Sequence, residues 1–266
     1  MSSGTARPTF AVSSRSTPLL ACDDLIQVAR GAAVSGVDLD LTGSALRRRL
    51  THAKSLSDLS DVLSTWIPPT NGSLDDLLAR AWSPRGSLVV VDEERGSMPN
   101  GKRQLGAAIR LRGVVPASTR VALAIRPRNP EAGRAHLTRL ALLRNLAAEW
   151  DLDLALDLSG PVDWLWEAEA AVYRLGPRLR LLRITFPLPT LDAHTRSRLT
   201  QRTLAASVDT AFDGLIAVVC PMPIWQWRAS SALERSTRTA VERLAGRFGI
   251  TPLHAPWNVP QRSPAP

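Results

Sequence analysis

Short apolar runs rich in β-branched residues alternate along the chain with longer amphipathic stretches. The apolar runs have the length of buried strands, and the stretches between them carry helix punctuation such as Gly176 and Pro177. This order is typical of repeated βα units and of a parallel sheet. The pattern predicts strands at Thr9–Ser14, Val37–Thr42, Val62–Pro69, Ser87–Glu94, Arg120–Pro127, Leu152–Gly160, Leu179–Pro187 and Gly214–Pro221.

Eight strands, each followed by a helix, fill a chain of 266 residues. This number and length fit a (β/α)8 barrel, the α/β architecture known as the TIM barrel. A doubly wound open sheet would usually stop nearer about six strands. We therefore expect one barrel domain over residues 9–254, a flexible N-terminus over residues 1–8 and a proline-rich tail over residues 255–266. The pattern does not fix the position of the third strand.

The charge of the chain changes this picture in one respect. Lysine and arginine together number 33 against 24 acidic residues, and Lys54 and Lys102 are the only lysines. A net charge of +9 permits contact with nucleic acid or with small anions, whereas arginine in place of lysine is also the composition expected from a GC-rich genome. No apolar stretch is long enough for a membrane helix or placed as a signal peptide. The expectation is therefore a cytoplasmic protein without membrane contact.

The residues that usually hold metals and nucleotides are scarce. The chain has 2 cysteines and 4 histidines, and neither set has the spacing of a zinc or HExxH motif. No GxxxxGK[ST] loop and no GxGxxG turn follows a predicted strand. We expect no cofactor on these grounds.

Arginines, carboxylates and tryptophans gather at the carboxyl ends of the predicted strands. These ends and the loops after them form the active face of a (β/α)8 barrel. Such a ring could bind a polyol through charged hydrogen bonds and stacking, or an anion through guanidinium groups. In strand order the ring holds Arg15, Asp40, Trp66, Asp92 with Glu93 and Glu94, Arg126, Asp157, Arg183, and Trp225 with Trp227.

Three segments carry a resemblance to a known family. The opening strand, the helix that ends in GVDLDL and the stretch LALDLSGPVDWLWEAEAAVYRLGPRLRLLRI are similar to the xylose isomerase-like sugar isomerases and epimerases. The resemblance covers most of the chain in the order of elements, and the first forty residues and residues 150–187 at the level of motifs. It implies a TIM barrel that holds a divalent metal between carboxylates and a histidine, and that shifts a hydrogen or proton between adjacent sugar carbons.

The sequence departs from the ligand pattern of that family. Asp157 matches the aspartate of the sixth strand, but the histidine expected three residues later is absent. Arg126 and Arg183 stand where the resemblance implies a glutamate and a histidine, and the glutamate of the eighth strand falls on Val219 or Cys220. Because a guanidinium cannot bind a cation, we expect no divalent metal site of the usual kind.

Arg126, Asp157 and Arg183 lie on neighbouring predicted strands and predict an ion-paired cluster in place of the metal. The cluster either fills the barrel mouth as an internal salt bridge or leaves surplus positive charge for a phosphate or carboxylate ligand. Asp92 and the two glutamates after it are predicted to begin a solvated loop. Cys220 is predicted to be a buried thiol rather than a nucleophile.

Three functions remain open at this point. The first is a divergent sugar isomerase- or epimerase-like barrel that binds a carbohydrate or small anionic metabolite through Arg15, Trp66, Arg126, Arg183, Trp225 and Trp227. The second keeps the isomerase or epimerase chemistry with Asp40, Glu93 and Asp157 as catalytic residues, Asp40 or Glu93 being the proton-transfer base. The third is a nucleic-acid-binding barrel like endonuclease IV, which is disfavoured because four scattered histidines cannot supply its trinuclear zinc site. The oligomeric state is not indicated.

Overall fold

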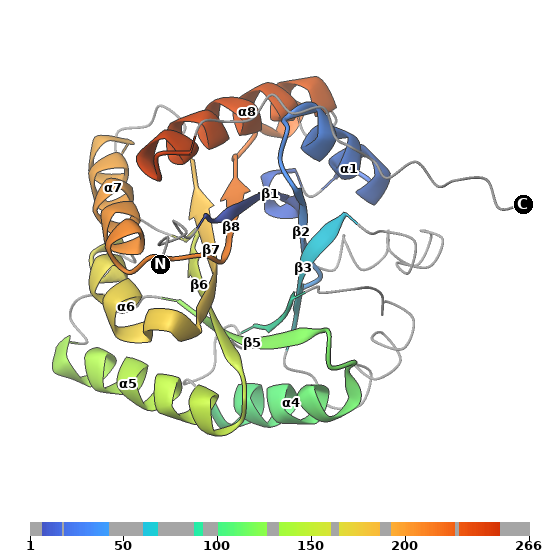
Figure 1. Ribbon diagram of the computed structural model, residues 1–266. Coiled ribbons are helices and arrows are strands. Elements are labelled where there is room, and N and C mark those ends of the chain that lie inside the picture. Colours follow the sequence, from blue (N-terminus) through green and yellow to red (C-terminus); the bar gives the residue numbers. More distant parts are fainter. Residues whose placement is uncertain are drawn as a thin grey trace, which may run out of the picture.

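Eight parallel strands close into a barrel in chain order, with β1 hydrogen-bonded to β8 (Figure 1). The computed structural model describes residues 7–17, 19–42, 61–68, 88–92, 101–126, 133–160, 165–186, 193–226 and 229–250. The closed barrel confirms the (β/α)8 fold and places the third strand. The strands are β1 (Thr9–Ser13), β2 (Gly36–Asp40), β3 (Val62–Ile67), β4 (Leu88–Val91), β5 (Arg120–Ile125), β6 (Asp153–Leu158), β7 (Leu179–Thr185) and β8 (Leu215–Val219).

The described helices lie on the outside of the barrel and pack against the outer face of its strands (Figure 1). The helix α6 ends at Gly176, whose φ of 55° is in the left-handed region that glycine adopts without steric cost. The helices predicted after the second and third strands fall outside the described residues. The described helices are α1 (Cys22–Gly31), α4 (Gly101–Val114), α5 (Gly133–Glu149), α6 (Ala168–Leu175), α7 (Ala193–Asp209) and α8 (Ser230–Arg247), with single 3-10 turns η1 (Ser14–Ser16), η5 (Gly176–Arg178) and η6 (Ile224–Gln226).

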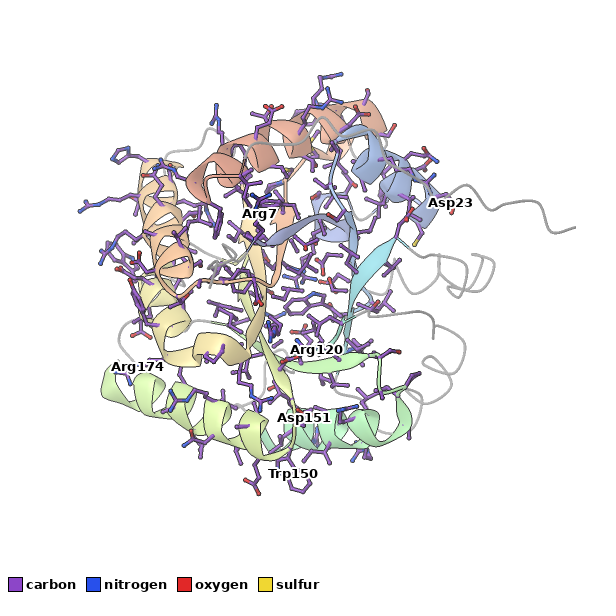
Figure 2. All side chains as sticks on the ribbon, viewed as in Figure 1. Arg7, Asp23, Arg120, Trp150, Asp151 and Arg174 are labelled. Carbon is purple, nitrogen blue, oxygen red and sulfur yellow. The ribbon has the colours of Figure 1, made fainter. Side chains whose placement is uncertain are left out.

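Along each strand, successive side chains point in turn toward the barrel interior and toward the helices outside it. Outward-facing valines, leucines and isoleucines pack under the helices in the larger apolar core. The smaller core inside the barrel is rich in alanine, since Ala11, Ala122, Ala124 and Ala155 belong to it. These small side chains leave space inside the barrel for a few large ones. Side chains fill this interior, as a packed TIM barrel requires (Figure 2).

Some expectations concern residues outside the described part of the chain. Residues 1–6 and the proposed tail 255–266 are among them, as are Glu93, Glu94 and Trp227. The domain limits and the roles assigned to these side chains therefore stay predictions. Among the residues that are described, no helix is both long and apolar enough to cross a membrane.

Candidate ligand site at the barrel mouth

Arg183 crosses the barrel interior from β7 and stacks on Trp66 of β3. The guanidinium carbon lies 3.6 Å from the ring centroid, and both side chains are completely buried. Asp38 of β2 balances the charge, because Arg183 Nε donates to its Oδ2 at 2.9 Å and Trp66 Nε1 donates to its Oδ1 at 2.7 Å. A buried guanidinium on an aromatic face gains cation–π energy as well as ion pairing. Trp66 is thus enclosed in the interior, which corrects its expected role as a ligand-contacting residue.

Asp40 joins this inner pair to Arg15. Its Oδ2 accepts from Arg183 Nη1 at 3.1 Å and from Arg15 Nε, while its Oδ1 accepts from the backbone N–H of Thr42 at 2.9 Å. The residue is held in place by its own N–H, which donates to Ser14 Oγ at 2.8 Å. Burial alone would raise the pKa of Asp40, but Arg183 and then Arg15 outweigh it and hold the pKa well below its usual range. Asp40 is therefore a stable carboxylate and a weak base.

Asp157 of β6 lies at the centre of the arginines. Its Oδ2 is 2.9 Å from Arg15 Nη1, 3.2 Å from Arg126 Nε and 4.0 Å from Arg183 Nη1. Its Oδ1 accepts from the N–H and the hydroxyl of Ser159 at 3.0 and 2.5 Å. Burial acts to raise the pKa of this carboxyl, but Arg183, Arg15 and Arg126 together lower it. The structure thus brings together the three residues expected to form an ion-paired cluster.

Asp92 follows β4 directly and pairs with Arg126. The Arg126 Nη2 atom lies 2.6 Å from Oδ1 and 2.8 Å from Oδ2 of Asp92. Asp92 is buried, with 2% of its surface exposed, so the expectation of a solvated loop start is corrected at this residue. Burial outweighs the attraction of Arg126 and raises the pKa of Asp92. Burial acts to lower the pKa of Arg126, but Asp92 and then Asp157 raise it.

We call these seven residues the mouth cluster: Arg15, Arg126, Arg183, Asp38, Asp40, Asp92 and Asp157. It contains three guanidiniums and four carboxylates, which leaves one negative charge in excess when all are ionised. The expected surplus of positive charge is therefore not found among these seven residues. Sequence reasoning left Asp38 out of the site, although its alternation with Asp40 already placed both on one face of the strand.

Solvent reaches the outer edge of the mouth cluster and not its centre. The side chain of Arg15 is 20% exposed and that of Arg126 10%, whereas Arg183 and Asp157 are closed off. Within the described residues, the Nη2 atom of Arg15 and the hydroxyl of Thr185 at the end of β7 are buried without a hydrogen-bond partner. Buried donors of this kind carry a desolvation cost until something accepts from them.

Trp225 and Cys220 follow β8 at the same end of the barrel. Trp225 lies in η6 and exposes 82% of its surface, and among the described residues no hydrogen bond or ring contact joins it to the mouth cluster. Cys220 is a buried free thiol, and burial raises its pKa to about 11. A protonated, enclosed thiol is a poor nucleophile, which agrees with its predicted structural role.

The described residues do not fit a divalent metal ion at this mouth. In the described ranges, no three side chains of His, Cys, Asp or Glu are grouped to hold one. Asp157 already accepts from Ser159 and from guanidiniums on both sides. A cation beside Asp157 would be repelled by the guanidiniums of Arg15, Arg126 and Arg183, which lie close to this carboxylate and stay charged. Arginine also cannot ligate the cation, because a guanidinium has no acceptor atom.

The architecture defines a closed parallel (β/α)8 barrel with its polar cluster at the carboxyl ends of the strands. Solved structures of three sugar enzymes share this fold. A D-psicose 3-epimerase with D-tagatose from Clostridium cellulolyticum superposes with a TM-score of 0.61 at 11% identity, over 90% of this chain and 99% of the other. A D-allulose 3-epimerase from Methylomonas sp. in complex with D-allulose gives 0.57 at 13%, over 90% and 97%. A sugar phosphate isomerase/epimerase from Parabacteroides distasonis gives 0.57 at 12%, over 93% and 98%.

At these identities the likeness is one of fold, and it confirms the (β/α)8 TIM barrel that the sequence pattern indicates. No model of a known protein family matches the chain, and no curated protein sequence matches it.

Proposed function

We propose that this barrel binds a neutral carbohydrate at its mouth without a divalent metal ion, as a sugar-binding protein or an enzyme that has lost the metal-dependent reaction. One observation carries the proposal. Arg126 and Arg183 stand at the two strand ends where the family resemblance implies metal ligands. Their guanidiniums donate hydrogen bonds to the carboxylates of Asp157, Asp38 and Asp92.

The charge of the mouth cluster favours a neutral polyol over an anion. When all seven groups are ionised, the four carboxylates exceed the three guanidiniums by one charge and repel a phosphate or carboxylate ligand. A sugar hydroxyl, in contrast, can donate to a carboxylate and accept from an arginine. Arg15, whose side chain is 20% exposed and whose buried Nη2 atom has no hydrogen-bond partner, is the guanidinium placed to donate to such a hydroxyl. Fixed polar groups of this kind orient a ligand in a concave site.

Proton transfer by Asp40 is not favoured. An efficient general base has a pKa near the working pH, and the arginines hold the pKa of Asp40 well below its usual range. Asp157 is completely buried, and its pKa is also lowered. The alternative of an active isomerase then depends on Glu93, which lies outside the described residues.

Trp225 supplies an aromatic face at the same end of the barrel. Tryptophan presents a large apolar ring with a polar N–H, and such rings stack on the C–H faces of sugars. The exposure of 82% leaves this ring accessible, unlike Trp66. D-Tagatose and D-allulose, the sugars bound to the fold neighbours, are suitable first ligands to test.

Calorimetric titration of each sugar in EDTA and in Mn²⁺ tests the proposal. We expect the same dissociation constant in both buffers, and binding at least about tenfold weaker in Trp225→Ala because a stacked aromatic contributes about 1 kcal/mol or more. Trp150→Ala is the matched control, since Trp150 is 45% exposed and follows α5 at the opposite end of the barrel. Its affinity should equal that of the wild type.

Two results would overturn the proposal. The first is a stoichiometric metal ion whose removal abolishes sugar binding. The second is failure of both ketohexoses and their aldose isomers to bind at millimolar concentration. Solvent hydrogen exchange into a bound ketose would instead establish the isomerase alternative.

A further inference from the structure

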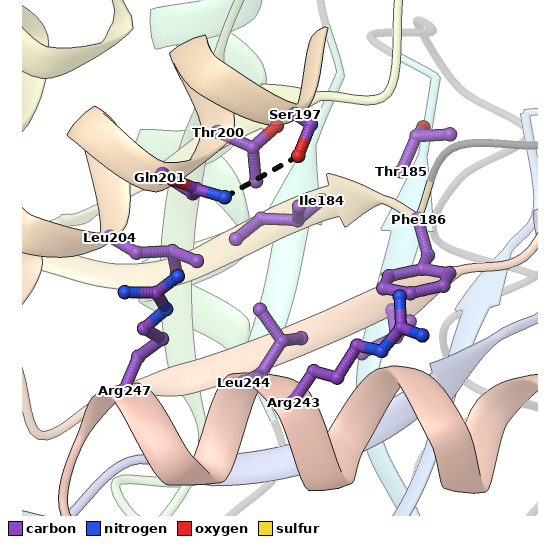
Figure 3. A pocket seen from close by; sticks show the side chains of 11 residues that line it. Ile184, Thr185, Phe186, Ser197, Thr200, Gln201, Leu204, Arg243, Leu244 and Arg247 are labelled. Atoms are coloured by element: carbon purple, nitrogen blue, oxygen red, sulfur yellow. Dashed lines mark hydrogen bonds between the residues drawn. The ribbon is translucent and has the colours of Figure 1, made fainter. Parts of the chain in front are cut away.

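A separate cavity of about 320 Å³ lies outside the barrel, between α7, α8 and the strands β7 and β8 (Figure 3). Its volume is in the range of small-molecule sites. The cavity exists because α7 packs mainly against α6, while α8 packs mainly against α1, so the two helices leave the strands between them partly uncovered. The apolar part of its lining consists of Ile184, Phe186, Leu204, Val218 and Leu244.

The cavity lies on the other side of β7 from the mouth cluster. Arg183 points into the barrel, so its neighbour Ile184 points outward to the helices. Polar side chains of α7 form one wall, where Gln201 Nε2 donates to Ser197 Oγ at 3.5 Å. No residue of the mouth cluster lines the cavity, although Thr185 at the end of β7 does, so the two proposed sites are distinct.

Two arginines of α8 form the opposite rim. Arg243 and Arg247 are four residues apart, which places both on the same face of the helix. Figure 3 shows Arg243 reaching toward Phe186 and Arg247 toward Leu204. The guanidinium carbon of Arg243 lies 5.5 Å from the ring centroid of Phe186, within cation–π range.

The rim is positive and has no acidic counterpart in the cavity. None of the lining residues is acidic, and neither Arg243 nor Arg247 forms a recorded ion pair with a carboxylate of the described residues. Like charges at this spacing on a helix destabilise it slightly. An anion at this rim would offset that repulsion and form charge-assisted hydrogen bonds.

We propose that this cavity binds a small organic anion with a flat apolar body, either an aromatic carboxylate or an aromatic phosphate monoester. The anionic group lies at the rim that Arg243 and Arg247 form, and the body covers Ile184, Val218 and Leu244. The apolar lining supplies affinity through buried area, and the two arginines select for negative charge.

Calorimetry with three probes of the same two-ring body tests the charge requirement. The probes are 2-naphthoate, 2-naphthyl phosphate and the neutral 2-naphthalenemethanol. At least one anion should bind at least about tenfold more tightly than the alcohol, which corresponds to about 1.4 kcal/mol. The tighter anion identifies the head group. An alcohol that binds as tightly as both anions, or failure of both anions to bind, overturns the proposal.

Variants of α8 and α7 locate the binding site. The double variant Arg243→Gln/Arg247→Gln should weaken the anion at least about tenfold and leave the alcohol unchanged. Arg235→Gln is the matched control, because Arg235 is exposed on the same helix and does not line the cavity. Ser197→Phe should fill the cavity and abolish binding of all three probes while circular dichroism shows an intact fold. Wild-type anion affinity in the double variant, or in a folded Ser197→Phe protein, would place the probe elsewhere and refute the proposal.

Discussion

Replacing Arg183 with methionine is expected to destabilise the barrel strongly. Methionine has a similar length and fills most of the space beside Trp66, but it leaves Asp38 and Asp40 buried without this partner. Removing one member of a buried ion pair costs about 3–5 kcal/mol, because the remaining charge is uncompensated. We therefore expect the free energy of unfolding to fall by about 4 kcal/mol and the thermal midpoint by about 7 °C in a chain of this size.

Urea unfolding followed by circular dichroism measures this difference. Arg202→Met on α7 is the control, since the side chain of Arg202 is 54% exposed and that of its partner Glu169 is 35% exposed. Exposed pairs contribute about 1 kcal/mol or less, so this variant should remain near the wild type. Asp38→Asn in the Arg183→Met background should restore part of the loss by removing the uncompensated charge. A cost below about 1 kcal/mol for Arg183→Met, or equal costs for both arginines, would refute the reasoning.

The remaining predictions concern pH, backbone contacts and thiol chemistry. Asp40 and Asp157 have lowered pKa values in the folded state, so the stability they contribute is present above the unfolded pKa and lost as pH falls through the folded pKa. The thermal midpoint should therefore decrease as the pH is lowered below about 4. A midpoint that stays constant from about pH 5 to about pH 2.5 in calorimetric scans would contradict this. A Cβ at Gly214 would lie 2.4 Å from a backbone carbonyl oxygen of β7, so Gly214→Ala should lower stability in urea by about 2 kcal/mol or more. Gly246→Ala in the last turn of α8, where nothing lies within 4 Å, should raise it by about 0.5–1 kcal/mol, and the opposite order of the two glycine variants would contradict the contact argument. The Cys220 thiol, whose pKa burial raises to about 11, should react with a disulfide reagent at pH 8 only after unfolding; reaction at the rate of an exposed thiol would show that the β8 end opens readily.

The strands and the faces of their side chains could be predicted because both follow from local alternation. The pattern VDLDL already separates Asp38 and Asp40 from the apolar residues between them, and the barrel turns both carboxylates inward. The end of α6 at Gly176 could also be predicted from the local sequence, because it depends on the freedom of glycine to adopt a positive φ. Local rules of this kind do not involve distant partners.

The ion-pair partners depend on register, which local patterns do not determine. The pairing of β2 with β3 shifts between Val37 and Asp38, directly before the inward carboxylates. That of β6 with β7 shifts between Leu154 and Ala155, below Asp157. Such irregularities re-aim the side chains that follow them. The enclosure of Trp66 and the cavity beside α8 likewise depend on how the barrel closes and on the spacing between its helices.

The mouth cluster also indicates what is lost when guanidiniums replace a metal ion among buried carboxylates. Both neutralise the acids, and arginine does so through directional hydrogen bonds from a tethered group. A metal ion keeps a coordination position for substrate and polarises the oxygen bound there, whereas the Nη1 atoms of Arg183 and Arg15 are directed at Asp40 and Asp157. The cluster can therefore stabilise the barrel and orient hydroxyl groups at its edge, but its central arginines offer no Lewis acid and no open position. Ligand recognition without the metal-dependent reaction is the function that we propose on this basis.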